Sequence, residues 1–216
     1  GRDRESRHAS LLKSSPVPTV LIVAGSDSSC GAGVSADLET VRGMGCRPLL
    51  AVTSVTAQTD ETFLASHPIP PLVLRAQLEA AVQQAGDGIS AVKVGMLPDE
   101  TSVETVIEFL ERRDLPNIVI DPVLASTSRG PLAKEAGFSI MCRRLFPLAT
   151  LVTPNVPEAC RLTGLSCKGE KNLPALAKAI LGCGSTAVLV KGGHLLGEEC
   201  VDYLLQKIDS SGCKFR

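Results

Sequence analysis

Apolar and polar residues follow one another along this chain in blocks that predict strands and helices in alternation. Residues 19–24, TVLIVA, form an apolar and β-branched run that ends at Gly25, which is typical of a buried central strand. Val34, Leu38 and Val41 then recur at helical spacing before glycines that favour the end of a helix. Further strands are predicted at 48–57, 89–96, 117–123, 149–155, 186–193 and 200–205. Helices are predicted to begin at Pro71 and at Thr101, and others to cover residues 133–145, 155–163 and 173–182.

This alternation predicts an α/β fold. Strands joined by helices form βαβ crossovers, which build a parallel sheet covered by helices on both faces. The chain has 216 residues, a length that a single hydrophobic core can stabilise, and we see no linker or internal repeat in it. We therefore expect one domain over residues 18–216, preceded by a disordered tail at 1–17.

Charge and composition exclude several classes of partner. Lysine and arginine number 22 against 23 aspartates and glutamates, so the net charge of −1 provides no basic field for nucleic acid or an anionic membrane. Aromatic residues make up 3%, too few for the stacking platforms of single-strand binders. No apolar run approaches the roughly 18 residues of a membrane span. The eight cysteines contain no C-x-x-C pair, and we expect them to be reduced and buried.

The chemistry is expected in the loops that follow the strands, since ligands of open α/β sheets bind beyond the carboxyl ends of the strands. These loops are small, polar or charged, and they read GSDSSCGAG, TAQTD, GML, DPVLASTSRG, TPNVPE and KGGH. Three of these loops begin, directly after an apolar strand, with Asp-Pro-Val, Thr-Pro-Asn or Lys-Gly-Gly. Ordinary solvated loops would have less regular sequences than these. We therefore expect one edge of the sheet to bind a ligand.

The first loop contains Gly31-x-Gly33-x-x-Ala36, a formal match to the dinucleotide-binding fingerprint. The match is weak, because six residues separate Ala24 from Gly31 and no acidic residue closes the second strand. A Walker A loop is excluded, since Gly-Lys-Ser/Thr does not occur. What remains is a glycine-rich loop at a helix N-terminus that lets the backbone approach a ligand, with Asp27 available to accept a hydrogen bond.

Asn155 and Glu158 stand three residues apart at the start of a predicted helix, on one face. Hard oxygen ligands in this place suit Mg²⁺ held through waters beside nucleotide phosphates. The same pair is also a common helix start, with asparagine as N-cap and glutamate three residues on, which needs no metal. From these residues alone, the capping interpretation is the stronger of the two.

Six ordered segments carry a resemblance to a known family. VLIVAGSDSSCGAGVSADLET, AVTSVTAQT, VKVGML, IDPVLASTS, LVTPNVPEA and LVKGGH together resemble the hydroxymethylpyrimidine/phosphomethylpyrimidine kinases of thiamine biosynthesis, in the ribokinase-like superfamily. The similarity covers about residues 19–205, and the Ser-Thr-Ser after DPVLA is similar to eukaryotic and plant versions. The resemblance implies a ribokinase-like three-layer α/β/α fold with a mainly parallel sheet. It also implies phosphorylation of 4-amino-5-hydroxymethyl-2-methylpyrimidine and its monophosphate, with ATP and Mg²⁺.

The resemblance also assigns residues to the site. It implies that Gln58 and the backbone at Thr56 read the pyrimidine edge. Glutamine suits this task, because its amide offers a donor and an acceptor side by side, as an aminopyrimidine requires. The other implied substrate-binding residues are Gly25, Asp27, Ala32, Asp37, Met96 and Val123. The implied nucleotide-binding residues are Asn155, Glu158, Lys191 and Gly193, of which the first two would also organise Mg²⁺ through water.

Two features depart from the family's pattern. The family places its anion hole and catalytic residue in a Gly-Thr-Gly-Cys or Gly-Thr-Gly-Asp loop that opens a C-terminal helix, and this sequence ends at Arg216 before such a segment. We therefore expect a fragment that lacks the family's C-terminal helices, with apolar sheet surface uncovered and phosphoryl transfer severely slowed. Cys30 stands where relatives usually have glycine, and its side chain would crowd the ligand or require a different backbone conformation.

Three other functions are compatible with the residues. A pyridoxal kinase of the same superfamily is the nearest alternative, and Gln58 favours the pyrimidine over pyridoxal. A protein that binds the pyrimidine without catalysis would follow from a missing anion hole, and a Rossmann dehydrogenase is the weakest candidate. The resemblance allows a homodimer, a fused thiamine-phosphate synthase domain, and a location in the cytoplasm or a plastid.

Overall fold

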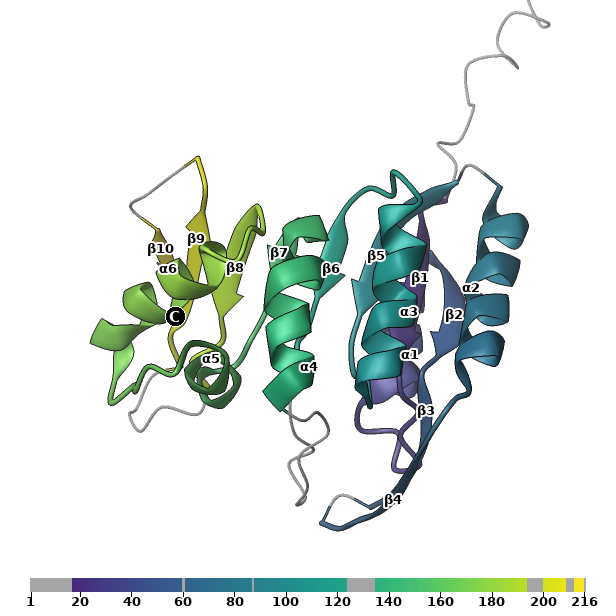
Figure 1. The fold of residues 1–216 in the computed structure, drawn as a ribbon, viewed down its shortest axis with the longest axis horizontal. Coiled ribbons are helices and arrows are strands. Elements are labelled where there is room, and N and C mark those ends of the chain that lie inside the picture. The colour runs from purple at the N-terminus through teal and green to yellow at the C-terminus, as the bar shows by residue number, and fades with distance from the viewer. Residues whose placement is uncertain are drawn as a thin grey trace, which may run out of the picture.

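The computed structural model describes residues 17–59, 61–86, 88–123, 135–193, 200–208 and 212–215. Through these residues runs an eight-stranded sheet in the order β10-β9-β8-β7-β6-β5-β1-β2 (Figure 1). Its strands are β1 (Thr19–Ala24), β2 (Arg47–Val52), β5 (Ile89–Val94), β6 (Ile118–Ile120), β7 (Leu151–Val152), β8 (Ala187–Val190), β9 (Asp202–Gln206) and β10 (Cys213–Phe215). Pairing is parallel from β2 to β8 and antiparallel at β9 and β10, so the sheet is mainly parallel, as predicted.

Six helices accompany the sheet in the described part of the chain. They are α1 (Gly33–Gly43), α2 (Pro71–Ala85), α3 (Glu100–Glu111), α4 (Glu135–Ile140), α5 (Val156–Thr163) and α6 (Leu173–Leu181). Alternate residues of β1 belong to two apolar clusters: Leu21 and Val23 join the large core beneath α2 to α6, whereas Ile22 and Ala24 pack with Val34 of α1. Hence α1 lies on one face of the sheet and the other helices lie on the opposite face.

The face that carries α1 is only partly covered by the described residues. Val119, Leu151, Leu189 and Leu204 alternate with core residues of β6 to β9, and all four side chains are half-buried. The physical reason is the strand order: from β2 onward the chain moves across the sheet in one direction, and right-handed crossovers then place every helix on the same face. Among the described residues, α1 is the helix on this face, and the apolar side chains of β6 to β9 are therefore only partly covered there.

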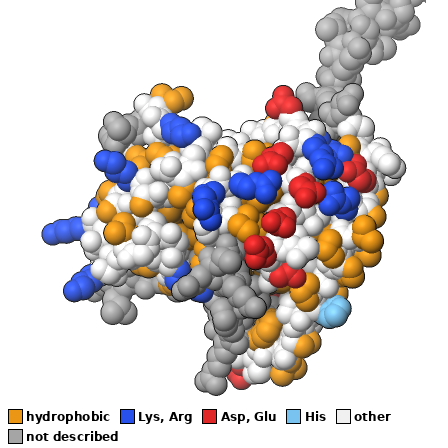
Figure 2. All heavy atoms as spheres, viewed as in Figure 1, with side chains coloured by type: hydrophobic (Ala, Val, Ile, Leu, Met, Phe, Trp, Pro, Cys, Tyr) orange, Lys and Arg blue, Asp and Glu red, His pale blue; other side chains and the backbone are white. Residues whose placement is uncertain are grey.

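The covered face also carries ion pairs between helices. Arg75 of α2 contacts Glu108 of α3 at 2.9 Å, and Arg113 after α3 contacts Glu79 of α2. Figure 2 shows acidic and basic side chains mixed over this region. Such exposed pairs contribute about 0.2–1 kcal/mol each, so the packing of α2 and α3 rests mainly on the apolar core below them.

The predicted strand at 48–57 is divided into two strands, because the chain leaves the large sheet at Thr53. The Thr53 N–H donates to the Ala24 carbonyl at 2.9 Å, and its hydroxyl donates to the Met96 carbonyl at 2.7 Å. The following residues form β3 (Ser54–Gln58), which pairs with β4 (Phe63–Pro68) in a separate two-stranded antiparallel sheet. No glycine or proline marks the change of direction, and β4 was not predicted.

Helix ends differ from prediction at two places. The N-cap of α3 is Asp99, which accepts from the Ser102 N–H at 2.8 Å, so the helix begins at Glu100 and not at the predicted Thr101. The predicted helix at 133–145 consists of α4, a wider turn at Met141–Leu145 and a 3₁₀ turn at Phe146–Leu148. Most of the predicted tail and the Ser-Thr-Ser lie outside the described residues. No described helix is long and apolar enough to cross a membrane.

Candidate functional site

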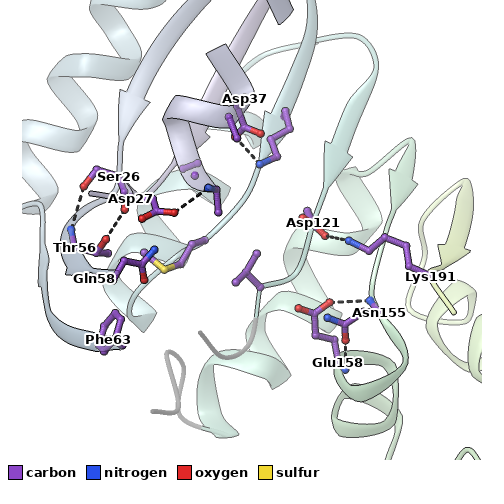
Figure 3. A pocket seen from close by; sticks show the side chains of 18 residues that line it. Ser26, Asp27, Asp37, Thr56, Gln58, Phe63, Asp121, Asn155, Glu158 and Lys191 are labelled. Carbon is purple, nitrogen blue, oxygen red and sulfur yellow. Dashed lines mark hydrogen bonds and ion pairs between the residues drawn. The ribbon is translucent and has the colours of Figure 1, made fainter. Parts of the chain in front are cut away.

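A cavity of about 390 Å³ lies where β1, β5, β6, β7 and β8 end, at the predicted binding edge (Figure 3). The structure brings together in its lining every predicted site residue except Gly193. These are Gly25, Asp27, Ala32, Asp37, Thr56, Gln58, Met96, Val123, Asn155, Glu158 and Lys191. Ser26, Phe63, Lys93 and Asp121 also line the cavity and were not assigned from the sequence.

The glycine-rich loop between β1 and α1 is organised by Asp27. One oxygen of its carboxylate accepts from the Ser29 N–H at 2.8 Å and the Ser29 hydroxyl at 2.7 Å. The other oxygen accepts from the Ala32 N–H at 2.8 Å. Asp27 therefore uses both carboxylate oxygens to hold its own loop, which makes it a positioning residue for the loop.

Electrostatics support this arrangement of Asp27. The residue is 6% exposed, and its burial disfavours the charged carboxylate. Hydrogen bonds from the side chains of Gln58 and Ser29, and from the N–H groups of Ser29 and Ala32, outweigh the burial and lower the pKa of Asp27. The carboxylate is therefore ionised at neutral pH and accepts from all of these donors.

Backbone geometry explains two residues of the same loop. Gly33 has φ +60°, and a Cβ there would lie 2.4 Å from the Gly25 carbonyl oxygen, so no larger residue fits. Cys30 has φ +62°, in the left-handed region, and its side chain is exposed. The left-handed backbone at Cys30 is one that glycine adopts readily, so whether the cysteine changes the loop relative to its relatives stays a prediction.

Hydrogen bonds of serine side chains connect the β3–β4 hairpin to this loop. The Thr56 N–H donates to the Ser26 hydroxyl at 3.0 Å, and the Thr56 hydroxyl donates to the Ser26 carbonyl at 2.7 Å. The Ser28 hydroxyl likewise bridges the N–H and carbonyl of Gln58, at 2.7 and 2.6 Å. The Thr56 amide is thus engaged by the loop, and the Gln58 side chain is held beside Phe63, its partner on β4 (Figure 3).

Two ion pairs lie along the cavity. Lys93 of β5 reaches Asp37 of α1, with 2.6 Å between nitrogen and oxygen. Lys191, directly after β8, reaches Asp121 at 2.8 Å, and the Thr153 hydroxyl donates to the same Asp121 oxygen at 3.2 Å. Each pair joins elements that are distant in sequence and neutralises one carboxylate of the lining.

At the start of α5, Asn155 and Glu158 form a reciprocal capping box. The Asn155 side chain accepts from the Glu158 N–H at 2.8 Å, and the Glu158 carboxylate accepts from the Asn155 N–H at 2.8 Å. The capping interpretation is therefore confirmed. Both residues nevertheless line the cavity, so the capping box also fixes where their oxygens stand relative to Lys191.

The two glycines of the Lys-Gly-Gly motif have different surroundings. A Cβ on Gly192 would lie 1.9 Å from the Val201 carbonyl oxygen, and the Gly192 N–H donates to Asp202 at 2.9 Å. Gly192 is thus required for the close approach of the chain segments around β8 and β9. Gly193 is exposed and lies outside the cavity lining, so its place beside a nucleotide stays a prediction.

Three lining residues had signals in the sequence that were not used. Lys93 is a charged residue inside an apolar strand, and Asp121 directly follows β6 in the Asp-Pro-Val motif. Phe63 belongs to the hairpin strand that was not predicted, and it is one of only five phenylalanines. A lysine in a buried strand indicates a partner or a ligand, because an isolated charge is costly to bury.

Comparisons with known proteins give a consistent result. A family model described as phosphomethylpyrimidine kinase matches residues 27–214. The hydroxymethylpyrimidine/phosphomethylpyrimidine kinase of Haemophilus influenzae is 38% identical over 194 residues, covering 88% of this chain and 71% of that protein. A rice protein, the "probable thiamine biosynthetic bifunctional enzyme, chloroplastic", is 37% identical over 195 residues, covering 90% of this chain and 35% of its own length.

Solved structures agree in fold. A phosphomethylpyrimidine kinase from Clostridium difficile has a TM-score of 0.81 and 34% identity, covering 92% of this chain and 84% of that chain. The ADP complex of Bacillus subtilis pyridoxal kinase has a TM-score of 0.79 and 30% identity, covering 92% of this chain and 74% of that chain. The predicted ribokinase-like fold is thereby confirmed.

Proposed function

The chain belongs to the phosphomethylpyrimidine kinase family, and from this premise we propose that it transfers the γ-phosphate of ATP to hydroxymethylpyrimidine and then to its monophosphate. One observation carries the proposal. One end of a single cavity carries Gln58, which suits an aminopyrimidine. The other end carries Asn155, Glu158 and Lys191, which suit a polyphosphate. In-line phosphoryl transfer depends mainly on such positioning of two substrates.

At the pyrimidine end, the orientation of Gln58 follows from its neighbour. The ionised Asp27 carboxylate only accepts hydrogen bonds, so the Gln58 amide must turn its NH₂ group toward Asp27. Its oxygen and second N–H are then offered to the substrate, where they match the exocyclic amine and the adjacent ring nitrogen of an aminopyrimidine. The Phe63 ring and Met96 provide apolar surface for the heteroaromatic ring.

At the nucleotide end, the charges of the lining favour a metal ion. Carboxylates outnumber lysines among the lining residues, so the polyphosphate of ATP would enter an acidic environment. Mg²⁺ bound there would offset the phosphate charge. The donor set fits, because Mg²⁺ usually takes one or two carboxylates plus phosphates and waters, and Glu158 provides a carboxylate in the lining. Asn155 and Glu158 would hold it through water.

Lys191 is proposed to bind the phosphates. Its partner Asp121 lies in the same cavity, and the Lys191 side chain is 39% exposed. A phosphate group entering the cavity would therefore share or replace Asp121 as the partner of the ammonium group. Lysine commonly binds phosphate in this way, as a point charge.

The test uses the protein expressed from its native coding sequence. It is incubated with ATP, Mg²⁺ and either hydroxymethylpyrimidine or pyridoxal, and products are identified by mass spectrometry. We expect turnover of the pyrimidine, and Gln58→Leu should raise its KM about tenfold or more through loss of two hydrogen bonds. Gln83→Leu, on the exposed side of α2, is the matched control. Turnover of pyridoxal alone would overturn the substrate assignment.

The structural likeness to pyridoxal kinase makes pyridoxal phosphorylation the second candidate, and the same assay distinguishes the two. Pyrimidine binding without ATP turnover would instead support a binding protein. The name of the rice relative supports two further proposals, a plastid location and a longer protein with a fused synthase domain. A homodimer is also proposed, and light scattering on the native protein tests it.

A further inference from the structure

Three buried serine hydroxyls have no hydrogen-bond partner in the part of the chain that the structure describes. They belong to Ser54, Ser66 and Ser185. The residues Ser54 and Ser185 are fully buried, whereas Ser66 is half-buried. A buried hydroxyl without a partner destabilises the fold, so its presence requires an explanation. The three serines differ in where they lie relative to the cavity described above.

Ser54 lies directly behind the cavity wall. Gly25 lines the cavity, and a Cβ built on it would lie 2.8 Å from the Ser54 Oγ and 2.3 Å from the Met96 Cε. The Ser54 hydroxyl and the end of the Met96 side chain therefore meet in front of the Gly25 α-carbon. Met96 lines the cavity and Ser54 does not, so the Met96 thioether covers the hydroxyl on its cavity side.

The backbone at these two residues is fixed, whereas the covering side chain can turn. The Ser54 carbonyl accepts from the Ser26 N–H at 2.8 Å. The Met96 carbonyl accepts from the Thr53 hydroxyl at 2.7 Å. The Met96 residue is only half-buried, and an unbranched thioether changes its rotamer easily. A rotation of the Met96 side chain alone would therefore open the Ser54 hydroxyl to the cavity.

The other two unpaired serines are placed differently. Ser185 comes before β8, whereas the cavity lies beyond the end of that strand, so Ser185 stands at the opposite edge of the sheet. Ser66 lies on β4 opposite Thr56 and is not part of the cavity lining. Ser54 thus differs from both, because the atoms that cover its hydroxyl belong to the lining itself. Ser185 provides a matched comparison outside the site.

We propose that Ser54 is a specificity-determining residue, whose hydroxyl donates a hydrogen bond to a ring nitrogen of the substrate once Met96 has turned away. The inference rests on the proposed pyrimidine kinase activity. Ser54 and Gln58 lie on the same face of β3, four residues and roughly 13 Å apart along the strand. The long Gln58 side chain and a six-membered ring fill this distance, with a hydrogen bond of about 2.9 Å at each end of the ring.

In this arrangement each polar edge of the pyrimidine has its own partner. Gln58, which extends into the cavity from β3, takes the exocyclic amine and the adjacent ring nitrogen (Figure 3). Ser54 then donates to the second ring nitrogen, which is an acceptor. A pyridine ring has one nitrogen and cannot use both residues. Because the Ser54 hydroxyl has no partner in the free protein, pairing it with the substrate breaks no bond within the protein.

The experiment measures binding by calorimetry, without ATP, to the protein expressed from its native coding sequence. The two ligands are hydroxymethylpyrimidine and a pyridine analogue in which CH replaces the second ring nitrogen. We expect the wild type to bind the pyrimidine about fivefold to tenfold more tightly than the analogue, and Ser54→Ala to bind both equally. The free Ser54→Ala protein should also have a Tm about 2–4 °C higher, because an unpaired buried hydroxyl is removed.

Ser185→Ala is the matched control, with the same expected rise in Tm and an unchanged preference for the pyrimidine. Equal affinity of the wild type for the two ligands would overturn the proposal, as would a preference that persists in Ser54→Ala. A lower Tm of free Ser54→Ala would also overturn it, since the hydroxyl would then have a partner before the substrate binds. Binding of neither ligand by the wild type would overturn the proposed kinase function as well, whereas the other results leave that function standing.

Discussion

Replacing Asp27 tests whether one carboxylate holds the glycine-rich loop. In Asp27→Asn the single remaining oxygen can still accept from both Ser29 donors, but the new NH₂ group faces the Ala32 N–H. One hydrogen bond to a charged acceptor is lost and the others become neutral bonds. Since bonds to charged groups contribute about 1.5–3 kcal/mol, we expect a loss of about 2 kcal/mol for Asp27→Asn and about 4 kcal/mol for Asp27→Ala.

The pH dependence of stability gives this prediction a second, independent readout. The pKa of Asp27 is lower in the folded protein than in the unfolded chain. Its stabilisation is therefore fully present above the unfolded pKa of about 4, and it is lost as the pH falls further through the folded pKa. The stability difference between wild type and Asp27→Asn should be constant from neutral pH down to about pH 5 and shrink below about pH 4.

The assay is urea unfolding at a series of pH values, with the free energy obtained by linear extrapolation. Asp114→Asn is the control, because Asp114 is exposed after α3. Pyrimidine binding measured by calorimetry should weaken in Asp27→Asn as the loop and Gln58 lose their common support. The reasoning would be refuted by an Asp27→Asn protein as stable as wild type within about 0.5 kcal/mol, or by a difference of unchanged size at pH 3.

Three further substitutions have expected outcomes. Cys30→Gly should raise the free energy of unfolding by about 0.5–1 kcal/mol in urea, because the left-handed backbone at this position suits glycine. Glu158→Gln keeps an acceptor for the Asn155 N–H, so stability should change by less than about 0.5 kcal/mol. The Mg²⁺ concentration for half-maximal turnover should nevertheless rise about tenfold. Lys191→Gln should raise the KM for ATP about tenfold in steady-state kinetics and leave pyrimidine affinity unchanged.

The location of the cavity could be predicted because topology alone fixes it. Parallel strands joined by crossovers bring all their carboxyl ends to one edge, so the loops after residues 24, 94, 120, 152 and 190 must meet there. The polar composition of those loops predicted a ligand-binding edge, and the family resemblance then named its residues. Family resemblance added roles to them, and these roles await the experiments above.

The hairpin could not be predicted in the same way. Residues 48–57 read as one continuous strand, and the break at Thr53 is set by its hydrogen bonds to Ala24 and Met96. These are tertiary contacts between loops that adjoin three different strands, and no local sequence pattern indicates them. The same applies to the covering of the sheet, because the face on which each helix packs depends on the order of the strands.

The two ion pairs of the cavity differ in a way that assigns them different tasks. The side chains of Lys93 and Asp37 are 26% and 20% exposed, whereas those of Lys191 and Asp121 are 39% and 26% exposed. The less exposed pair is screened less by water and is harder to separate, so it holds α1 against β5 and keeps the glycine-rich loop in place. The more exposed pair costs less to open, and its lysine stands beside Asn155 and Glu158. We therefore expect a polyphosphate that enters the cavity to displace the Lys191 pair and to leave the Lys93 pair intact.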